Sequence, residues 1–349
     1  MSREVCIGGQ KIGPGHPPFV ICEISANHNG NINRAFDLID EAAKTGCSAI
    51  KLQTYTADTM TIDHDSDEFK IKDGLWEGYN LYELYEEAHT PLDWHKAIFD
   101  RAKSKEVQIF STPFDETAAD FLDNLGVPAF KIASFELTDI PLIEHVAKKQ
   151  KPIIVSTGMG NLQEIALAVE TIRNTGNEDI ILLHCVSSYP APIEQSNVAT
   201  VKHLSETFDV VSGLSDHTLS NAASISAIAL GGSVIEKHFT IDRTEGGPDS
   251  AFSLEPREFS MLCNECHNAW QAVGRPDYTI KQSEVINLKF RRSIYFVKDL
   301  KAGEIISLDS VRVIRPGYGL SPVEIRNIIG RKVKFDVKRG TPVKHDDLE

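Results

Sequence analysis

Two lysines and several serines lie in or beside apolar segments of this sequence, where burying their polar side chains would cost free energy. Lys51 and Lys131 lie inside short apolar segments, and Ser134, Ser156 and Ser215 follow or end such segments. A buried polar group is unfavourable unless it finds partners, so a set of this kind points to a ligand. Ammonium groups and hydroxyls bind phosphate oxygens, and a chain of net charge −14 needs a local cluster of cations to attract an anionic substrate. The set predicts a phosphate site, although either lysine alone could instead pair with a buried carboxylate.

Two histidines and a glutamate are the next groups that could do chemistry. His217 and His238 end consecutive apolar segments, so parallel packing of those segments would let the two imidazoles share one ligand. Imidazoles with open coordination positions suit Mn²⁺, Co²⁺ or Mg²⁺; a single histidine is more often a hydrogen-bonded core residue. Glu23 ends the first long apolar segment and is a candidate catalytic base or water-orienting carboxylate. Its alternative role is a buried ion pair with Lys51.

These polar groups follow a regular alternation of short apolar segments with longer segments of helical periodicity. The apolar segments are rich in Val and Ile and short enough to be strands buried on both faces. Eight such strand–helix units in about 270 residues predict a (β/α)₈ TIM barrel, in which the carboxyl ends of the strands meet at one mouth. A doubly wound open sheet is the second choice, because the sequence lacks a Gly-rich nucleotide fingerprint. The expected strands are Phe19–Ile24, Ala49–Gln53, Val107–Ser111, Ala129–Ala133, Ile153–Ser156, Ile180–His184, Val210–Leu214 and Val234–Lys237.

The barrel is expected to form a catalytic domain over residues 1–275, opened by a hairpin pattern in residues 1–15. Apolar positions with a period near 3.6 predict a helix from Asn33 to a stop at Gly46. Another helix is expected to begin at Ser220 as its N-cap. The last helix of the barrel is expected over Glu255–Gly274.

The C-terminal part of the sequence has a different character. Residues 276–288 are polar and are expected to form a linker. Residues 289–349 contain an internal repeat, in which Asp299–Val311 matches Asp336–Leu348 at charged, glycine and apolar positions. The repeat predicts a small β-rich domain with two similar halves.

One connection within the barrel is unusually long. Tyr55 to Asn80 shows little periodicity, and an irregular stretch of this length is usually functional or disordered. Its Asp63–Asp67 run begins like a calcium loop, but Glu68 occupies the place of the required glycine and Gly74 that of the bidentate glutamate. We therefore expect a solvated acidic loop and no calcium site.

Composition excludes several classes of partner. The net charge of −14 argues against nucleic acid and anionic membranes, which would need a basic face. The sequence has no apolar run of the roughly 18 residues that a membrane span requires, and Met1 to Gly15 lacks the apolar region of a secretory signal. We expect a cytoplasmic protein, and cysteines scattered among apolar segments fit a reducing compartment.

At this point the strand-end motifs resemble one known family along nearly the whole chain. The sequence is similar to the sialic acid synthase family, and its C-terminal part resembles that family's antifreeze-like (SAF) domain. The motifs are Cys22–Gly30 (CEISANHNG), Lys51–Thr54 (KLQT), Ser111–Phe114 (STPF), Lys131–Ser134 (KIAS), Ser156–Met159 (STGM), Tyr189–Pro192 (YPAP), Leu214–Thr218 (LSDHT), Glu236–Thr240 (EKHFT) and Gly247–Asp249 (GPD), with Arg315-Pro316-Gly317 in the C-terminal domain.

Two stretches resemble one branch of that family. Gly74–Pro91 and Gly246–Pro256 look like the pseudaminic acid synthases rather than the N-acetylneuraminate or legionaminate synthases. The resemblance implies that the sugar substrate is 2,4-diacetamido-2,4,6-trideoxy-altrose.

The resemblance also implies a mechanism. Phosphoenolpyruvate attacks the aldehyde of the open-chain sugar through its C3, water adds at C2, and the tetrahedral intermediate loses phosphate by C–O cleavage. A divalent ion on His217 and His238 would polarise the aldehyde, and Glu23 would orient or deprotonate groups around C2. The residues expected to hold phosphoenolpyruvate are Lys51, Lys131, Ser134, Ser156, Ser187 and Ser215. Ser187 departs from the N-acetylneuraminate synthases, which tend to have Asn there; the shorter serine could act through a water.

The sugar contacts and the assembly follow from the same resemblance. Gln53, Tyr189 and Asp249 are expected to contact the sugar. Arg315 would reach the active site of a partner subunit, which implies a domain-swapped homodimer. Aromatic side chains of the long connection and its following helix are a further hypothesis: they could pack against the C6 methyl of a deoxy sugar or merely cover the barrel rim. They are Trp76, Tyr79, Tyr82 and Tyr85.

Three alternatives stay open at this stage. The first is the same reaction with another sugar, such as N-acetylmannosamine or the legionaminate precursor. The second is a metal-dependent aldolase that uses pyruvate and releases no phosphate, for which two phosphate-facing lysines have no use. The third is a non-enzymatic carbohydrate- or ice-binding protein acting through its tail, which would not need the lysines and histidines at the strand ends.

Overall fold

The structure is a computed structural model that describes residues 4–349. The chain divides into two compact units, one that runs to Gly274 and one that spans Arg275–Glu349.

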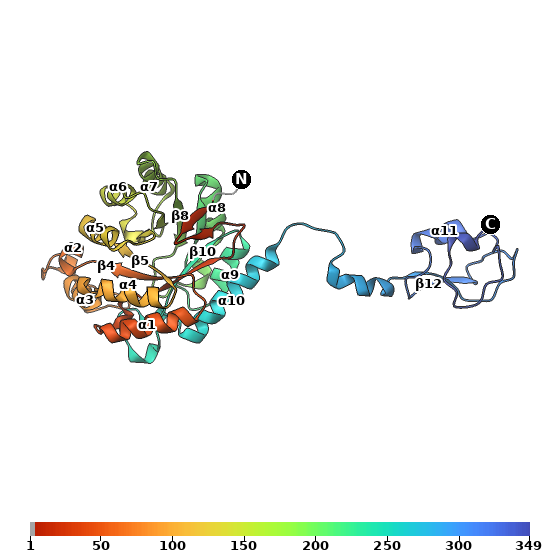
Figure 1. Cartoon of the computed structure of the whole chain (residues 1–349), viewed down its shortest axis with the longest axis horizontal. Coiled ribbons are helices and arrows are strands. Elements are labelled where there is room, and N and C mark those ends of the chain that lie inside the picture. The colour runs from red at the N-terminus through yellow and green to blue at the C-terminus, as the bar shows by residue number, and fades with distance from the viewer. Residues whose placement is uncertain (1–3) are drawn as a thin grey trace. The chain divides into compact units, whose positions relative to one another are not determined.

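The first unit is a closed barrel of eight parallel strands in the order β10-β3-β4-β5-β6-β7-β8-β9 (Figure 1). Nearly all strand residues are buried, because side chains fill the barrel on one face and pack under helices on the other. Each strand begins within one residue of the expected start, which confirms the predicted fold class. The strands are β3 (Phe19–Glu23), β4 (Ala49–Thr54), β5 (Gln108–Pro113), β6 (Phe130–Ile132), β7 (Ile153–Ser156), β8 (Ile180–Cys185), β9 (Val211–Ser215) and β10 (Val234–His238).

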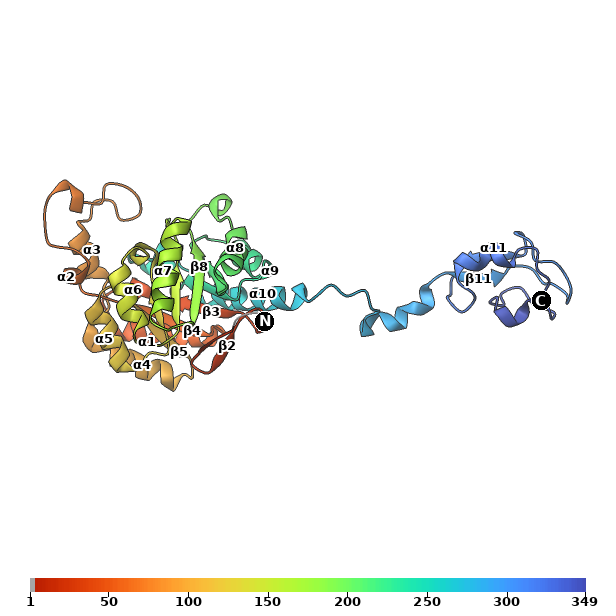
Figure 2. The same ribbon diagram turned by 90° about the horizontal axis from the view of Figure 1, so that it is seen from above.

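Helices surround the strands (Figures 1 and 2). In α1 the buried residues Ala35, Leu38, Ile39 and Ala42 follow the spacing of one helical face, and the Asn31 side chain caps the first turn by accepting from Asn33 N. The helices of this unit are α1 (Ile32–Lys44), α2 (Ala57–Met60), α3 (Leu81–Ala88), α4 (His95–Ser104), α5 (Glu116–Leu125), α6 (Ile140–Ala147), α7 (Leu162–Asn174), α8 (Ala199–Phe208), α9 (Ala222–Ala229) and α10 (Pro256–Val273).

The expected N-terminal hairpin is present, and the helix expected after Ser220 begins one residue later than predicted. Strand β1 (Val5–Ile7) pairs antiparallel with β2 (Gln10–Ile12), and Gly8 and Gly9 supply the positive φ angles of the turn. Helix α9 begins after Asn221, one residue later than expected, and Asn221 makes no capping bond with its side chain. The Ser220 hydroxyl accepts from Ala222 N at 3.1 Å and so caps the first turn, while the Ser220 carbonyl accepts from buried Lys237 at 3.1 Å.

The long connection after β4 contains little regular structure, as expected. Between Tyr55 and Asn80 the chain forms only α2 and a 3-10 helix at Asp67–Phe69. Asp65 and Asp67 are highly exposed and pair with Lys70 and Lys72. The connection is therefore a solvated loop.

The second unit confirms the two similar halves predicted from the repeat. The repeats pair with each other: Leu300 and Val337 exchange both backbone hydrogen bonds. Lys301 binds Asp336 at 2.7 Å, and the equivalent Lys338 binds Asp299 at 2.8 Å.

Equivalent positions of the two repeats also behave alike in the core of this unit. Gly303 and Gly340 both have positive φ, and Ile306 and Val343 are both fully buried. The regular elements of the unit are β11 (Ser293–Phe296), β12 (Val311–Ile314) and α11 (Ile325–Ile328), preceded by 3-10 turns at Gln282–Phe290.

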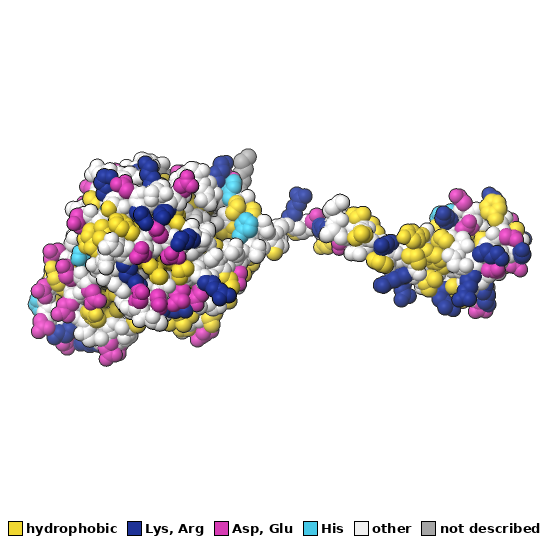
Figure 3. All heavy atoms as spheres, turned by 60° about the horizontal axis from the view of Figure 1, so that its bottom comes forward, with side chains coloured by type: hydrophobic (Ala, Val, Ile, Leu, Met, Phe, Trp, Pro, Cys, Tyr) yellow, Lys and Arg dark blue, Asp and Glu magenta, His cyan; other side chains and the backbone are white. Residues whose placement is uncertain are grey.

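The surfaces of the two units differ in charge (Figure 3). Lys and Arg outnumber Asp and Glu by 16 to 10 in Arg275–Glu349, although the whole chain has a net charge of −14. Within the described part of the chain, no helix is long and apolar enough to cross a membrane.

Candidate active site

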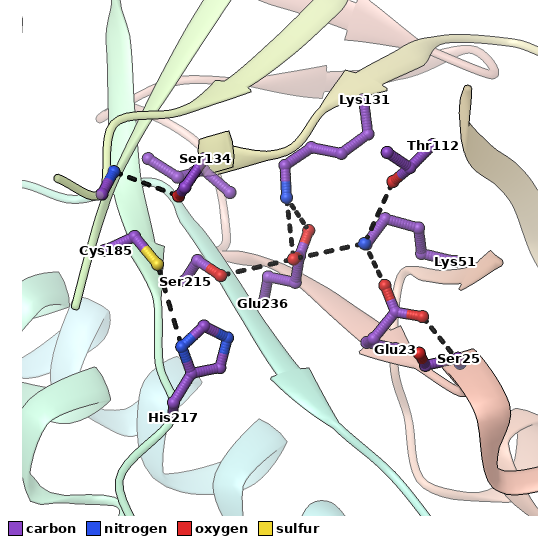
Figure 4. A network of polar contacts seen from close by, with 12 residues as sticks. Glu23, Ser25, Lys51, Thr112, Lys131, Ser134, Cys185, Ser215, His217 and Glu236 are labelled. Atoms are coloured by element: carbon purple, nitrogen blue, oxygen red, sulfur yellow. Dashed lines mark hydrogen bonds and ion pairs between the residues drawn. The ribbon is translucent and has the colours of Figure 1, made fainter. Parts of the chain in front are cut away.

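The carboxyl ends of the barrel strands bring together two lysines and two glutamates. Lys131 Nζ on β6 lies 2.8 Å from both carboxylate oxygens of Glu236 on β10. Lys51 Nζ on β4 contacts Glu23 and lies 3.5 Å from Glu236 Oε1, so it stands between the two carboxylates (Figure 4). It also donates to Thr112 Oγ1 at 3.2 Å. All four charged side chains are almost completely buried, and together they carry no net charge when each is ionised.

Glu23 is held by the backbone as well as by Lys51. Ser25 N donates to Glu23 Oε1 at 2.7 Å. Ser25 reaches this position with a φ of 37°, which is unusual for a residue other than glycine. The carboxylate is thus fixed in the mouth of the barrel. The ion pair with Lys51, which was the alternative to a role as a base, is present in this structure.

Burial and charge shift the two glutamates in opposite directions. Burial raises the pKa of Glu23 to about 6, against the opposing effect of Lys51. Burial would also raise the pKa of Glu236, but the ammonium groups of Lys131 and Lys51 outweigh it and hold this pKa at about 2. The two lysines therefore favour the ionised form of Glu236 more strongly than that of Glu23.

The predicted serines end or follow the strands β6, β7, β8 and β9. Ser215 Oγ donates to Glu236 Oε1 at 3.3 Å. Ser134 accepts from Gly158 N at 3.1 Å, and a Cβ at position 158 would collide with the hydroxyls of both Ser134 and Ser187. Ser156 Oγ is buried and has no hydrogen-bond partner among residues 4–349. Hydroxyls and a backbone amide thus gather beside the two lysines, in a form suited to an anion.

The two histidines lie together at the ends of neighbouring strands, His217 in the turn after β9 and His238 as the last residue of β10. Their ring centroids are 5.5 Å apart. His217 Nδ1 lies 3.0 Å from the carbonyl oxygen of Val186, which can only accept, so Nδ1 carries the hydrogen and Nε2 is left for a ligand. His238 Nδ1 is buried without a hydrogen-bond partner in the described part of the chain, and its nearest carboxylate, Asp249, is 3.9 Å away. Burial lowers the pKa of His238 well below its usual value, which favours the neutral imidazole.

These two imidazoles suit a divalent ion that is held weakly by few protein ligands, and they do not suit an ion whose ligands all come from the protein. No group of three or more His, Cys, Asp and Glu side chains within residues 4–349 is arranged to hold a metal. A buried nitrogen without a partner on His238 and a free Nε2 on His217 are nevertheless suitable ligands for an ion that keeps positions for water or substrate.

Three of the four predicted sugar contacts lie at the same mouth. Tyr189, on the turn after β8, has its ring 4.4 Å from that of His217. Asp249, on the loop after β10, is buried beside Ala26. Gln53 is half-buried and shares a strand face with Lys51, two residues earlier on β4. Arg315 is exposed in the second unit, and its role in a partner subunit stays a prediction.

The aromatic residues of the long connection separate into two groups. Trp76 Nε1 donates to the carbonyl of Pro248 at 2.9 Å, and its ring lies 5.6 Å from that of Tyr189. Trp76 therefore joins the loop after β4 to the loop after β10. In contrast, Tyr79 and Tyr82 bind surface carboxylates, so they are not part of the mouth.

Several residues of the mouth were not assigned a role from the sequence. Glu236 is the centre of the charged network. It stands two residues before His238 on one strand, so the two side chains share a face, and this spacing could have assigned Glu236 to the mouth. Phe252 packs 4.8 Å from His238, from a loop that carries no such signal. Glu136 follows β6, and its Oε2 is buried with no hydrogen-bond partner in residues 4–349. Burial raises the pKa of Glu136 to about 7.

Two family models match the chain. One, described as the NeuB family, matches residues 38–278, and the other, described as the SAF domain, matches residues 291–349.

Curated relatives match over nearly the full length. A pseudaminic acid synthase of Helicobacter pylori is 40% identical over 334 residues, which are 95% of this chain and 98% of the relative. An N,N'-diacetyllegionaminic acid synthase of Legionella pneumophila is 35% identical over 336 residues, which are 95% of this chain and 94% of the relative.

A solved structure agrees with these relatives. The crystal structure of an N-acetylneuraminic acid (sialic acid) synthetase from Leptospira borgpetersenii superposes with a TM-score of 0.74 at 32% identity, covering 83% of this chain and 97% of that chain. The match to the family model alone spans more than half of the sequence. The chain therefore belongs to the NeuB family, and a SAF domain follows its barrel.

Proposed function

We propose that this chain is a pseudaminic acid synthase, a transferase that condenses phosphoenolpyruvate with 2,4-diacetamido-2,4,6-trideoxy-β-L-altrose and water to give pseudaminic acid and phosphate. A C–C bond forms between C3 of phosphoenolpyruvate and the aldehyde carbon of the sugar. Water adds its oxygen at C2, and the C2–O bond to the phosphate breaks. The observation that carries the proposal is the pair of buried lysines beside two imidazoles at one barrel mouth, in a chain with a pseudaminic acid synthase as a 40% identical relative.

The anion site consists of the lysines and the hydroxyls around them. Lys51 and Lys131 would bind the phosphate and carboxylate oxygens of phosphoenolpyruvate, and the serine hydroxyls would complete the contacts: Ser134, Ser156, Ser187 and Ser215. An aldolase acting on pyruvate would not need two ammonium groups for its smaller anion. Because both lysines already contact carboxylates, the bound anion replaces part of an existing network and does not meet free cations.

Glu23 is the group best placed to move a proton at C2. Its carboxylate faces Lys51, and its pKa of about 6 allows both protonation states near neutrality. In the deprotonated state Glu23 would orient or deprotonate the water that adds at C2.

The sugar would lie between the imidazoles and the loops around them. A divalent ion (Mn²⁺, Co²⁺ or Mg²⁺) on His217 and His238 would act as a Lewis acid toward the aldehyde oxygen. Tyr189, Asp249 and Gln53 would bind the hydroxyl and acetamido groups and fix the aldehyde toward C3 of phosphoenolpyruvate.

The complete site would form in a homodimer in which the C-terminal unit of one subunit reaches the barrel of the other. The excess of Lys and Arg in Arg275–Glu349, in a chain of net charge −14, supports such pairing by charge. Mixing an Arg315→Ala variant with a His217→Ala variant tests it. Each is expected to be inactive alone, whereas mixed dimers should regain activity because one of their two sites has both residues; no recovery after verified subunit exchange would contradict the action of Arg315 in trans.

The function is tested by phosphate release. The purified chain is mixed with phosphoenolpyruvate, Mn²⁺ and one sugar at a time: the trideoxy-altrose, the legionaminate precursor, or N-acetylmannosamine. Release with the trideoxy-altrose alone, abolished by a chelator, is the expected result. Release with only another sugar would correct the substrate and keep the reaction, and no release from folded, metal-supplied dimer would overturn the function.

A further inference from the structure

One buried ion pair of the barrel has no place in the reaction described above. Residues 4–349 contain three lysines that are almost fully buried, and two of them, Lys51 and Lys131, lie in the mouth. The third, Lys237, stands on β10 between Glu236 and His238. Because side chains alternate along a strand, Lys237 points to the outer face of the barrel while its two neighbours point inward.

Lys237 makes contacts with the end of the neighbouring strand and the turn after it. Its Nζ lies 2.8 Å from Asp216 Oδ2, and it donates to the carbonyls of Thr218 at 2.6 Å and Ser220 at 3.1 Å. All three hydrogens of the ammonium can therefore be used. Burial lowers the pKa of Lys237 against the opposing effect of Asp216.

Asp216 is equally well satisfied. Its Oδ2 also accepts from Ser224 on α9 at 2.6 Å, and its Oδ1 accepts from Thr218 N at 2.9 Å. Its backbone N donates to the carbonyl of Glu236 at 2.9 Å. The pair thus connects β9, β10, the turn after β9 and the start of α9 at one point.

Stability alone is a poor reason for such a pair. Taking two charges out of water costs several kcal/mol for each ion, and replacing a buried pair with apolar residues is often neutral or stabilising. An apolar pair could not replace the hydrogen bonds of this network, which hold the carbonyls of Thr218 and Ser220 and the backbone N of Thr218, in the turn that directly follows His217. Asp216 and Lys237 immediately precede His217 and His238.

We propose that Asp216 and Lys237 are positioning residues that set the distance and orientation of the two imidazoles. Lys237 points away from the mouth, and the pair holds the turn that directly follows His217; the rings of His217 and His238 are 5.5 Å apart. The inference rests on the proposed role of His217 and His238 as metal ligands. It adds residues that touch neither metal nor substrate.

The test removes both charges and measures metal affinity separately from folding. The double variant Asp216→Leu/Lys237→Met of the full chain is titrated with Mn²⁺, with free Mn²⁺ read by electron paramagnetic resonance. Residues that orient metal ligands typically account for 10–100-fold in affinity, so we expect the Kd for Mn²⁺ to rise by about that factor. The free energy of unfolding should change little, and the KM for phosphoenolpyruvate should stay near that of the wild type while kcat falls.

A matched control and a reference variant make the result interpretable. Asp40 and Arg101 form an ion pair at 2.7 Å between α1 and α4, away from the mouth; the variant Asp40→Leu/Arg101→Met should leave the Kd for Mn²⁺ unchanged. His217→Ala should abolish binding at the site. If His217→Ala binds Mn²⁺ like the wild type, the proposed metal role itself fails.

The positioning role alone is overturned if His217→Ala loses Mn²⁺ while the folded double variant keeps the wild-type Kd. Should the double variant not fold, Asp216→Asn takes its place, since Asn retains an acceptor for Thr218 N but removes the charge opposite Lys237. Asp216→Asn is expected to raise the Kd several-fold, and an unchanged Kd in this folded variant would equally overturn the proposal.

Discussion

Removing the ammonium group of Lys131 should have two effects that can be measured independently: a lower free energy of unfolding and weaker binding of phosphoenolpyruvate. In Lys131→Met, Glu236 loses two contacts of 2.8 Å, and among residues 4–349 Lys51 at 3.5 Å and Ser215 at 3.3 Å remain. Breaking a buried pair in this way costs about 3–5 kcal/mol. Lys131 is the strongest of the charges that lower the pKa of Glu236 against burial, so its removal leaves a buried carboxylate with less compensation.

The second substitution tests whether this cost arises from the unpaired charge. Lys131→Met/Glu236→Gln removes both members, and Glu23 then remains paired with Lys51. The double variant should recover about 3 kcal/mol relative to the sum of the single variants, as expected for a strongly coupled pair. Phosphoenolpyruvate binding should not recover, because one charge-assisted contact of about 1.5–3 kcal/mol is still missing; this corresponds to a KM raised about 10- to 150-fold.

The unfolding measurement can be restricted to the barrel unit. The three tryptophans of the chain, Trp76, Trp94 and Trp270, all precede Arg275, so urea unfolding followed by tryptophan fluorescence reports on the barrel. Phosphate release at varied phosphoenolpyruvate gives KM. Unchanged stability in Lys131→Met, or a wild-type KM in either lysine variant, would refute the reasoning that this ammonium both balances Glu236 and binds the substrate anion.

Three further predictions concern the sugar, the pH and the metal. Trp76→Ala should raise the KM for the trideoxy sugar about tenfold, the usual effect of one lost apolar contact, and leave the KM for phosphoenolpyruvate unchanged. An unchanged KM for the sugar would mean that Trp76 only covers the rim of the barrel. The variant Trp76→Phe keeps an aromatic ring but removes the hydrogen bond to Pro248, so it separates the two contributions. Burial lowers the pKa of His28 from 6.5 to about 4, so the folded state binds fewer protons than the unfolded state and stability falls as the pH drops from 6.5 through 4. Between pH 7.5 and 5.0 the wild type should lose about 2 kcal/mol more than His28→Gln; equal losses in urea unfolding would show that His28 does not titrate in this way. A chelator should stop phosphate release and Mn²⁺ should restore it, whereas activity that survives exhaustive chelation would exclude a role for the ion.

Much of the barrel could be predicted from the sequence because its signals are local. Short runs of Val and Ile followed by segments with a period near 3.6 fix the element types, and each strand begins within one residue of its expected start. The reciprocal pairs Lys301–Asp336 and Lys338–Asp299 likewise follow from a repeat that is visible in the sequence. The hydroxyl of Ser220 caps α9 as its residue type indicated, although the helix begins one residue later than expected.

The candidate site was predictable as a set of residues and not as a set of contacts. Residues at strand ends could be recognised as polar groups in apolar surroundings. Whether a lysine is free to bind an anion or already contacts a carboxylate depends on which strands lie opposite each other, and both Lys51 and Lys131 contact glutamates. The place of Trp76 against Pro248 likewise depends on how two loops meet.

The sequence by itself determined the alternation of strands and helices and the polar residues at the strand ends, because hydrophobic periodicity and residue type act over a few neighbouring positions. Only the tertiary structure decided that Lys131 meets Glu236, 105 residues further along the chain, and that Lys237 points away from the mouth toward Asp216. Closing the barrel places β10 beside β3 and fixes the register in which His238 lies opposite Glu23. Those partners come from distant segments, and their meeting depends on the packing of the whole barrel.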